Sequence, residues 1–464
     1  MRRSFASKRH ACLAAVLATG CAGSSATSGP LAEPHEEHAP DRVGPGAAAA
    51  GLDLPDPAHG RPVSLAQMLA WADAHAPAVR VAESRMARAE AASEEARLLV
   101  PEEPTVSVAA GPRIVSGALD YDLQAWLGQR FEVAGERRLR IDAARALGHR
   151  FEAARAATRW EVHQRVHHAF HEALAARERL QALERVVAFE ERMLEIAQSR
   201  LRAGDVSPLQ VRLAEGERAR AQQRFLAARQ RYEAAQLTLA EAAGWPVTHP
   251  PEPAGKLDPP RDAPPLREML ELAEQHHPVL HELEVAVEEA QARVRLADRE
   301  AWPKPGVAVG YQREGHPGGP GQHSVLGRLR TDLPVARRNR GPRAEARAAV
   351  GEAEAERDAY AQRLQARVAR GMRAVQAAAD RVEVYGTELL PALEEGLRML
   401  ERAHELGEID VMQVAGATDR LLRAQEDALQ AYEDYHEAAA SLEAAVGTDL
   451  WEAERHDEPE GGPR

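Results

Sequence analysis

The sequence predicts a mainly α-helical protein with a small β part, in which one structural unit occurs twice. The 464 residues are rich in Ala, Arg, Glu and Leu, and only 4% are aromatic, a composition typical of long helices and coiled coils. Residues of the first half recur in the same order in the second half, which indicates an internal duplication. Short segments that alternate apolar and polar side chains occur at equivalent places in both halves, and this period of two indicates strands.

The charge balance and the motifs argue against two functional classes. With 59 Lys and Arg against 72 Asp and Glu, the formal net charge is −13, so the chain offers no large basic face to nucleic acid. The sequence contains no glycine-rich phosphate loop after a strand, no nucleophile elbow and no Cys/His cluster. We therefore expect no enzyme activity, no cofactor and no nucleic acid partner.

Residues 1–21 are predicted to be an export signal. Basic residues within the first ten positions precede an apolar run over 11–18 that is too short to span a bilayer. The run that ends in Cys21 resembles the bacterial lipoprotein box, in which this cysteine is acylated at the start of the mature chain. Ordinary signal cleavage, which would leave a free thiol at Cys21, is the alternative. The other cysteine of the chain, Cys12, would be removed with the signal, so no disulfide is expected.

Composition divides the rest of the chain into two repeats and the segments around them. A Pro/Gly/Ala-rich tether over 22–62 and a tail over 451–464 are expected to be disordered. A Pro-rich linker over 246–265 separates a first repeat over 63–245 from a second over 266–450. The evidence for repetition is that Leu65, Met68, Leu69, Ala72 and Pro77 recur 201 positions later (266 − 65), and Gly204, Tyr232, Leu239 and Gly244 recur 203 positions later (407 − 204).

Each repeat is expected to begin with a helix followed by a β-hairpin. In the first repeat the helix runs for about 37 residues over 64–100 and ends at Pro101, because proline cannot continue a helix. The predicted strands are Thr105–Gly111, Tyr121–Val133 and the two segments that contain Val307 and Val325.

Four strands per chain are too few to close a barrel. About eight strands is the smallest number that does so, whereas a strand of roughly 9 to 12 residues is long enough to cross a bilayer at a tilt. One face of the predicted strands is apolar, and the other carries polar side chains such as Arg328 and Arg330, which suit a water-filled interior. Several chains would therefore have to contribute their strands to one barrel.

Two helices joined by a short turn are expected to close each repeat. The chain over 136–203 has no proline and would form a helix of about 100 Å. Apolar and small residues recur every three or four positions, which predicts a coiled-coil seam. Gly204 and Gly407 are expected to end the first helix of each pair, and Asp205 or Ser207 to cap the next. Each repeat would then end in a helical hairpin with a tight tip.

This order of elements, covering about Val63 to Leu450, resembles the outer membrane efflux protein family, the TolC-type exit ducts of tripartite pumps. The segments over 129–138 and 332–341 look like the strand-to-helix crossings of its heavy-metal branch. The resemblance implies a homotrimer that forms a 12-stranded transmembrane β-barrel above a periplasmic α-helical coiled-coil barrel.

The same resemblance implies partners and site residues. The partners are a periplasmic adaptor (membrane fusion) protein, an inner-membrane transporter of the RND type or similar reached through the adaptor, and outer membrane lipid. By position, the tip residues that would meet the adaptor are Gly204, Asp205, Val206, Gly407, Glu408 and Ile409. Ducts of the family narrow near the tips with inward acidic side chains, for which Asp205, Asp410 and Asp419 are the candidates.

Three histidines at a spacing of four residues suggest a metal site. His163, His167 and His171 would share one face of a helix, and neutral imidazoles at this spacing can share Zn²⁺, Cu²⁺ or Co²⁺. The alternative is a polar stripe that faces solvent or another subunit, because no cysteine or carboxylate arrangement completes a ligand set.

Two functions follow from these observations. The first is an outer-membrane channel component of a tripartite efflux pump that passively conducts metal cations or small toxic compounds from the periplasm to the exterior. The second is a lipid-tethered periplasmic coiled-coil scaffold without a channel. The alternating segments favour the channel, since a scaffold needs no strands with one apolar face at equivalent places in both repeats.

Overall fold

The computed structural model describes residues 55–57, 60–115, 118–315, 319, 321–332, 339–385 and 389–451. The predicted signal with Cys21 and nearly all of the predicted tether lie outside the described residues. So do most of the second crossing segment, over 333–338, and the predicted tail from 452 onward.

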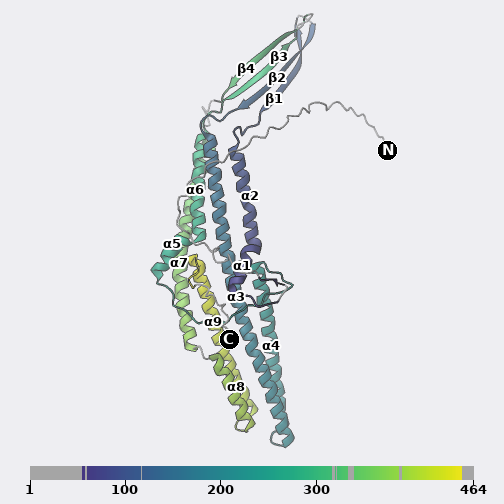
Figure 1. Ribbon diagram of the computed structural model, residues 1–464, viewed down its shortest axis with the longest axis vertical. Helices are drawn as coiled ribbons and strands as arrows, with labels where there is room; N and C mark the ends of the chain where they lie inside the picture. The colour runs from purple at the N-terminus through teal and green to yellow at the C-terminus, as the bar shows by residue number, and fades with distance from the viewer. Residues whose placement is uncertain are drawn as a thin grey trace, which may run out of the picture. The chain divides into compact units, whose positions relative to one another are not determined.

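Helices and strands follow one another in the same order in both halves, as Figure 1 shows, except that two helices of the second half, α7 and α8, correspond to the single long helix α3 of the first. The first half contains α1 (Leu65–His75), α2 (Pro77–Arg97), β1 (Thr105–Val115), β2 (Ala118–Arg130), α3 (Glu136–Ala203) and α4 (Pro208–Ala243). The second contains α5 (Leu266–His276), α6 (Pro278–Arg299), β3 (Gly306–Glu314), β4 (Gln322–Arg330), α7 (Arg340–Tyr385), α8 (Leu389–Glu405) and α9 (Val411–Val446). The predicted mainly α fold with a small β part and a duplicated unit is confirmed.

The prediction of one unbroken helix at the start of the first repeat was wrong. Ala76, with φ −58° and ψ 129°, separates α1 from α2, and Pro77 occupies the first turn of α2. The proline ring disfavours the helical conformation of the residue before it, so the chain turns there and starts a new helix. The second repeat is interrupted in the same way at His277, directly before Pro278.

The four strands form one antiparallel sheet in the order β1-β2-β3-β4. The register pairs Val108 with Ala125, Leu127 with Val309 and Val307 with Leu329. Since side chains alternate between faces, these apolar residues share one face of the sheet, and many of them are exposed. The opposite face, called the polar face below, carries Arg113, Asp122, Gln124, Trp126, Gln312 and Arg328. The alternation predicted from the sequence is confirmed, although β1 continues beyond the predicted Gly111 to Val115 and β2 spans Ala118–Arg130 instead of Tyr121–Val133.

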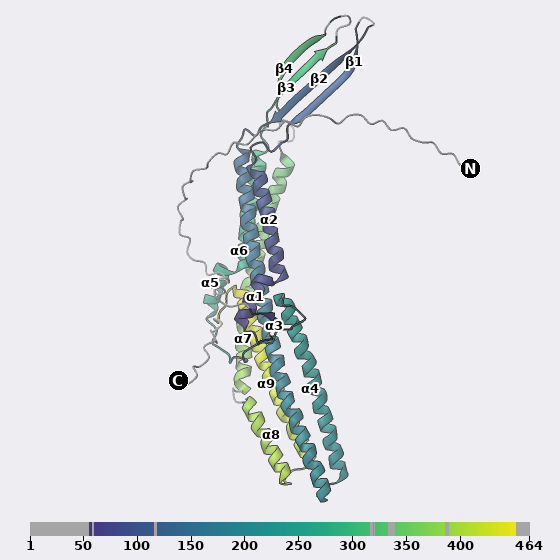
Figure 2. The same ribbon diagram turned by 45° about the vertical axis from the view of Figure 1, so that its right-hand side comes forward.

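The long helix α3 is the central element of the helical part. It packs against α2, α4, α6 and α9, and the two views in Figures 1 and 2 agree on this arrangement. One buried cluster forms where α1 and α4 meet α3, and an equivalent one where α5 and α9 meet α7. Met68 and Leu239 in the first cluster correspond to Met269 and Leu442 in the second, and all four are fully buried. The duplication in the sequence is thus a duplication of the core.

A glycine closes each of these two clusters. α4 ends at Gly244 with φ 69°, and α9 ends at Gly447 with φ 89°. Each glycine lies against a junction between two helices. Gly244 lies beside His75 to Pro77, between α1 and α2, and Gly447 lies beside His277 and Pro278, between α5 and α6. The left-handed conformation and the close backbone approach both require glycine here.

None of the described helices combines the length and the apolar character needed to cross a membrane.

Candidate functional site

The first tip is the turn between α3 and α4. α3 ends at Gly204, whose φ is 84° and whose N–H donates to the carbonyl oxygens of Arg200 and Leu201. Ser207 occupies the cap position of α4 and Pro208 its first turn, but the Ser207 side chain makes no capping hydrogen bond. The predicted tight hairpin is confirmed. Gly204 and Asp205 are exposed, whereas Val206 is half-buried.

The second tip, between α8 and α9, is held by more hydrogen bonds. Gly407 has φ 76°. The Asp410 carboxylate accepts a hydrogen bond from the Gln413 backbone N–H at 2.8 Å, and the Gln413 side chain accepts one from the Asp410 N–H at 2.9 Å. The side chain of Asp410, one of the three acidic gate candidates, is therefore engaged in capping α9. Gly407 and Glu408 are exposed, and Ile409 is half-buried.

A buried histidine and an arginine from α3 fix the second tip. His404 is 1% exposed, and its Nδ1 lies 3.0 Å from the carbonyl oxygen of Ile409. Arg200 donates from Nη1 to the carbonyl oxygen of His404 at 3.1 Å, which ties the end of α3 to the second tip. The position equivalent to His404 in the first tip is Leu201. The two tips therefore present different chemistry to a partner.

The structure separates the three acidic gate candidates. Asp205 lies in the first tip and Asp410 in the second, while Asp419 lies within α9 and faces α4. The Arg224 side chain on α4 donates to Asp419 Oδ1 at 3.0 Å, and Arg423 donates to Asp419 Oδ2. The hydrogen bond from Arg224, together with the positive charge of Arg423, holds the pKa of Asp419 below its usual value. Asp419 is thus an ionised link between the two hairpins.

A cavity of about 440 Å³ lies beside this link, between α3, α4 and α9. Its charged lining residues are Glu190, Glu217, Arg220, Arg224, Asp419 and Arg423. Burial, and secondarily the negative charge of Glu217, raises the pKa of Glu190 to about 7. Glu190 and Arg224 were not among the residues predicted from the sequence, and no local motif marks them, because their partners come from other helices.

The three histidines proposed as metal ligands each have a different neighbour. His163 Nε2 lies 2.9 Å from Asp449 Oδ1, and His167 Nε2 lies 3.7 Å from Glu443 Oε2. The ring of His171 stacks on that of His436 with centroids 4.4 Å apart. Within the described part of the chain, no three His, Cys, Asp or Glu side chains are placed to hold one metal ion. The predicted metal site is therefore not assembled, because each imidazole points to its own partner on α9 or just beyond it.

Burial sets the protonation of this histidine cluster. It lowers the pKa of His167 to about 4, with the charge of His163 acting in the same direction, and it also lowers the pKa of His171 well below its usual value. Burial and the nearby Asp449 raise the pKa of Glu443 to about 7. The cluster is thus a largely buried polar contact between α3 and the end of α9, where proton affinity differs strongly from that in water.

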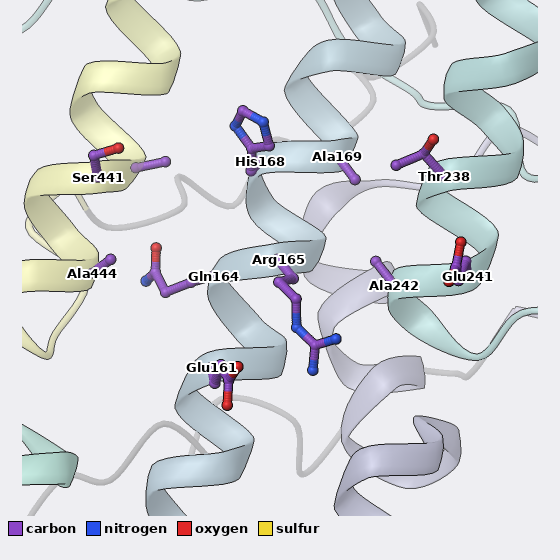
Figure 3. Close-up of a pocket in the computed structure, with 11 residues that line it drawn as sticks. Glu161, Gln164, Arg165, His168, Ala169, Thr238, Glu241, Ala242, Ser441 and Ala444 are labelled. Atoms are coloured by element: carbon purple, nitrogen blue, oxygen red, sulfur yellow. The ribbon is translucent and has the colours of Figure 1, made fainter.

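A groove of about 470 Å³ runs over α3 next to the histidine cluster. Figure 3 shows Gln164 on α3 directed toward Ser441 and Ala444 of α9, with Thr238 and Ala242 of α4 on the other side. Both polar atoms of the Gln164 amide are buried without a hydrogen-bond partner. More than half of the lining residues are Ala, Ser or Thr, and these short side chains leave the surface hollowed between α3, α4 and α9.

A comparison with protein families decides what kind of protein this is. The sequence profile of the family described as outer membrane efflux protein matches residues 68–245 and 269–448, which together are more than half of the chain. The chain belongs to the outer membrane efflux protein family. This family comprises the outer membrane channels of tripartite efflux pumps, whose members form trimers and work with adaptors and inner-membrane transporters.

Solved structures show that the fold of this efflux protein is that of known channels. The outer membrane protein VceC of Vibrio cholerae is 17% identical, with a TM-score of 0.63 over 83% of this chain and 97% of that one. CusC is 15% identical, with a TM-score of 0.64 over 88% of this chain and 99% of that one. The open state of the MtrE outer membrane channel of Neisseria gonorrhoeae is 18% identical, with a TM-score of 0.64 over 83% of this chain and 89% of that one. No curated protein sequence matches the efflux protein.

Proposed function

We propose that this protein is the outer-membrane channel component of a tripartite efflux pump, and that it conducts its cargo passively from the periplasm to the exterior. The observation that carries the proposal is the sheet, which has one apolar face, one polar face and two unpaired edges, β1 and β4. Unpaired edges of this length invite pairing with another chain. Three copies would supply twelve strands, enough for a closed barrel with the apolar faces toward lipid and the polar faces toward water.

The partners follow from the two ends of the molecule. The tips at Gly204 to Val206 and Gly407 to Ile409 would receive a periplasmic adaptor, which would connect the duct to an inner-membrane transporter of the RND type or similar. Differences such as His404 against Leu201 support two unequal docking positions. Acylation of Cys21 would add a lipid anchor in the outer membrane, at roughly 0.8 kcal/mol per buried CH₂.

The proposed cargo is either metal cations or small toxic compounds. The metal assignment rests on the segments over 129–138 and 332–341, which resemble the heavy-metal branch of the family. A deletion strain of the source bacterium separates the two cargo classes. Increased sensitivity to zinc, copper or cobalt salts alone would support metal cations, and increased sensitivity to organic compounds alone would exclude them.

Channel formation is tested on the purified full-length protein. We expect a trimer in detergent, resistance of the membrane-bound protein to a salt wash, and ion conductance after reconstitution in planar lipid bilayers. A monomer that salt alone releases and that conducts no ions would contradict the proposal and support the periplasmic scaffold.

We propose further that Asp419 is the gate residue among the three candidates, because it alone links α4 to α9. In this proposal the link between α4 and α9 holds the channel closed. Replacing Asp419 by asparagine removes the charge that Arg224 and Arg423 bind, so the link loses a partly exposed ion pair worth roughly 0.5–1 kcal/mol. The open population, and with it the mean conductance in bilayers, should rise about two- to fivefold.

The matched control for this prediction is Asp427→Asn, which removes the same charge from an exposed position of the same helix. It should conduct like the wild type. If Asp419→Asn also conducts like the wild type, the link does not hold the gate, and Asp205 or Asp410 becomes the stronger candidate.

A further inference from the structure

The polar face of the sheet carries an arginine stacked on a tryptophan. The Arg328 guanidinium carbon on β4 lies 3.7 Å from the centroid of the Trp126 ring on β2. The ring spans the intervening strand β3 at Gly310. A Cβ atom added to Gly310 would lie only 2.3 Å from the indole ring of Trp126. A glycine at this position is thus what allows the indole to lie flat across β3 and reach β4. Three strands together build the stack.

Arg328 differs from the other arginines on this face in its partners. Arg113 pairs with Asp122 at 2.8 Å and Glu314 at 3.4 Å, and Arg130 pairs with Asp332 at 2.7 Å and Glu102 at 3.6 Å. Among the residues that the structure describes, no carboxylate lies within ion-pair distance of Arg328, and its side chain is exposed. The stack therefore displays a positive charge that the sheet itself does not neutralise.

Stacking fixes the guanidinium without using its hydrogen-bond donors. A guanidinium on the face of an aromatic ring keeps its N–H groups in its own plane, pointing away from the ring. A planar, immobilised set of donors with a full positive charge is suited to bind an anion, in particular a carboxylate or phosphate group. Arg330 lies on the same face of β4 and is mostly exposed, but its Nε lies 4.0 Å from Asp332 Oδ1, so Arg328 is the arginine of this strand without a carboxylate partner among the described residues.

We propose that Arg328, positioned by Trp126, is an anion-binding site on the wall of the lumen. The placement in a lumen rests on the proposed function, since it requires that the polar faces of three sheets line one pore. Three such sites would then form a ring of positive charge that attracts anions and repels cations. Negatively charged compounds or anionic metal complexes would pass this ring more readily than bare metal cations.

The site itself is tested by tryptophan fluorescence of the full-length protein in detergent. Subtracting the emission of Trp126→Phe from that of the wild type isolates Trp126, and the same subtraction is made in an Arg328→Gln background. Iodide serves as the anionic quencher and acrylamide as the neutral one. We expect the iodide quenching constant of Trp126 to fall at least about twofold in Arg328→Gln, with no fall for acrylamide.

Arg313→Gln is the control, because it removes the same charge from the other face of the sheet. Arg313 lies on β3, directly across from Leu123 of β2. This variant should leave the iodide constant unchanged. The proposal is overturned if Arg328→Gln leaves iodide quenching unchanged, or alters iodide and acrylamide quenching by the same factor, since Arg328 would then only cover the ring.

The place of the site in the pore is tested by the reversal potential in a KCl gradient across a planar bilayer. Arg328→Gln should lower the permeability of chloride relative to potassium, whereas Arg313→Gln should not. A conducting pore with unchanged selectivity would contradict the lumenal role alone. A wild-type protein that conducts no ions would contradict the proposed function, and the quenching result would still decide whether the anion site exists.

Discussion

Replacing Gly447 by alanine is expected to lower the free energy of unfolding by about 2–4 kcal/mol. The new Cβ atom would lie 2.6 Å from the Cα of His277 and 3.1 Å from the Cδ of Pro278, so the backbone of the α5–α6 break would have to move. Alanine would also have to adopt the left-handed conformation, with φ near 89°, at a cost of about 1–2 kcal/mol. The measurement is urea unfolding of the full-length protein followed by circular dichroism.

Two other glycines separate the two contributions to this effect. Gly204 has nearly the same φ, 84°, but open space around its Cα, so Gly204→Ala should cost only about 1–2 kcal/mol. Gly351 lies in the exposed interior of α7 with nothing near it, so Gly351→Ala should stabilise by up to about 1 kcal/mol. A cost for Gly447→Ala no greater than that for Gly204→Ala would show that the contact with His277 and Pro278 contributes nothing.

Gly244 extends the prediction to the first repeat. A Cβ atom there would lie 2.8 Å from the carbonyl oxygen of His75 and 3.0 Å from the Cδ of Pro77. Gly244→Ala should therefore cost nearly as much as Gly447→Ala. The two effects should be similar because of the duplication, since Gly244 and Gly447 end the last helix of the first and second repeat and contact equivalent helix junctions.

Features set by neighbouring residues could be predicted from the sequence. The tips follow from left-handed glycines at Gly204 and Gly407, and the two faces of the sheet follow from a period of two. The break at Ala76 was also encoded locally, in Pro77, but the periodic pattern on both sides of it suggested a single helix. In this case the restriction that proline places on the preceding residue outweighed the periodicity.

Features set by pairing between distant helices could not be predicted. His163 meets Asp449 across 286 positions of sequence, and Arg224 meets Asp419 across 195. The spacing of the histidines correctly placed them on one helix face, but it contained no information on what the opposite helix presents. The structure supplies a carboxylate or a ring to each imidazole separately, which is why the spacing alone suggested a metal site.

Replacing Glu443 by glutamine is expected to stabilise the protein at about pH 8. As the pH falls from 8 to about 4.5, the free energy of unfolding of the variant should decrease more steeply than that of the wild type. In the wild type the pKa of Glu443 rises to about 7 from a usual 4.5, because it is buried and lies near Asp449. Between these two values the folded state keeps a proton that the unfolded state releases, so this group removes stability as pH rises through the window. Glutamine has no such loss, and its oxygen can still accept the backbone N–H of Leu450, which donates to Glu443 at 3.0 Å.

The histidines act in the opposite direction. His167 has a pKa of about 4 in the folded state against a usual 6.5, so below pH 6.5 the unfolded state binds a proton that the folded state does not. Stability from this group is complete above 6.5 and is lost as pH falls toward 4, and His171 and His436 add to the same slope. In the wild type Glu443 offsets part of this slope between about 4.5 and 6.5. Asp258 and Arg261, which also influence His436, are present in both variants.

The two slopes give the Glu443→Gln variant a distinct pH profile. Relative to the wild type, it should be more stable by about 2–3 kcal/mol at pH 8, with the difference shrinking to near zero at about pH 4.5. Urea unfolding across this range measures the profile, and the exposed Glu437→Gln on the same helix should run parallel to the wild type. A Glu443→Gln profile that also runs parallel to the wild type, or that lies below it at pH 8, would show that the carboxyl of Glu443 is ionised in the folded protein without penalty. The contact between α3 and the end of α9 would then not depend on a proton at Glu443.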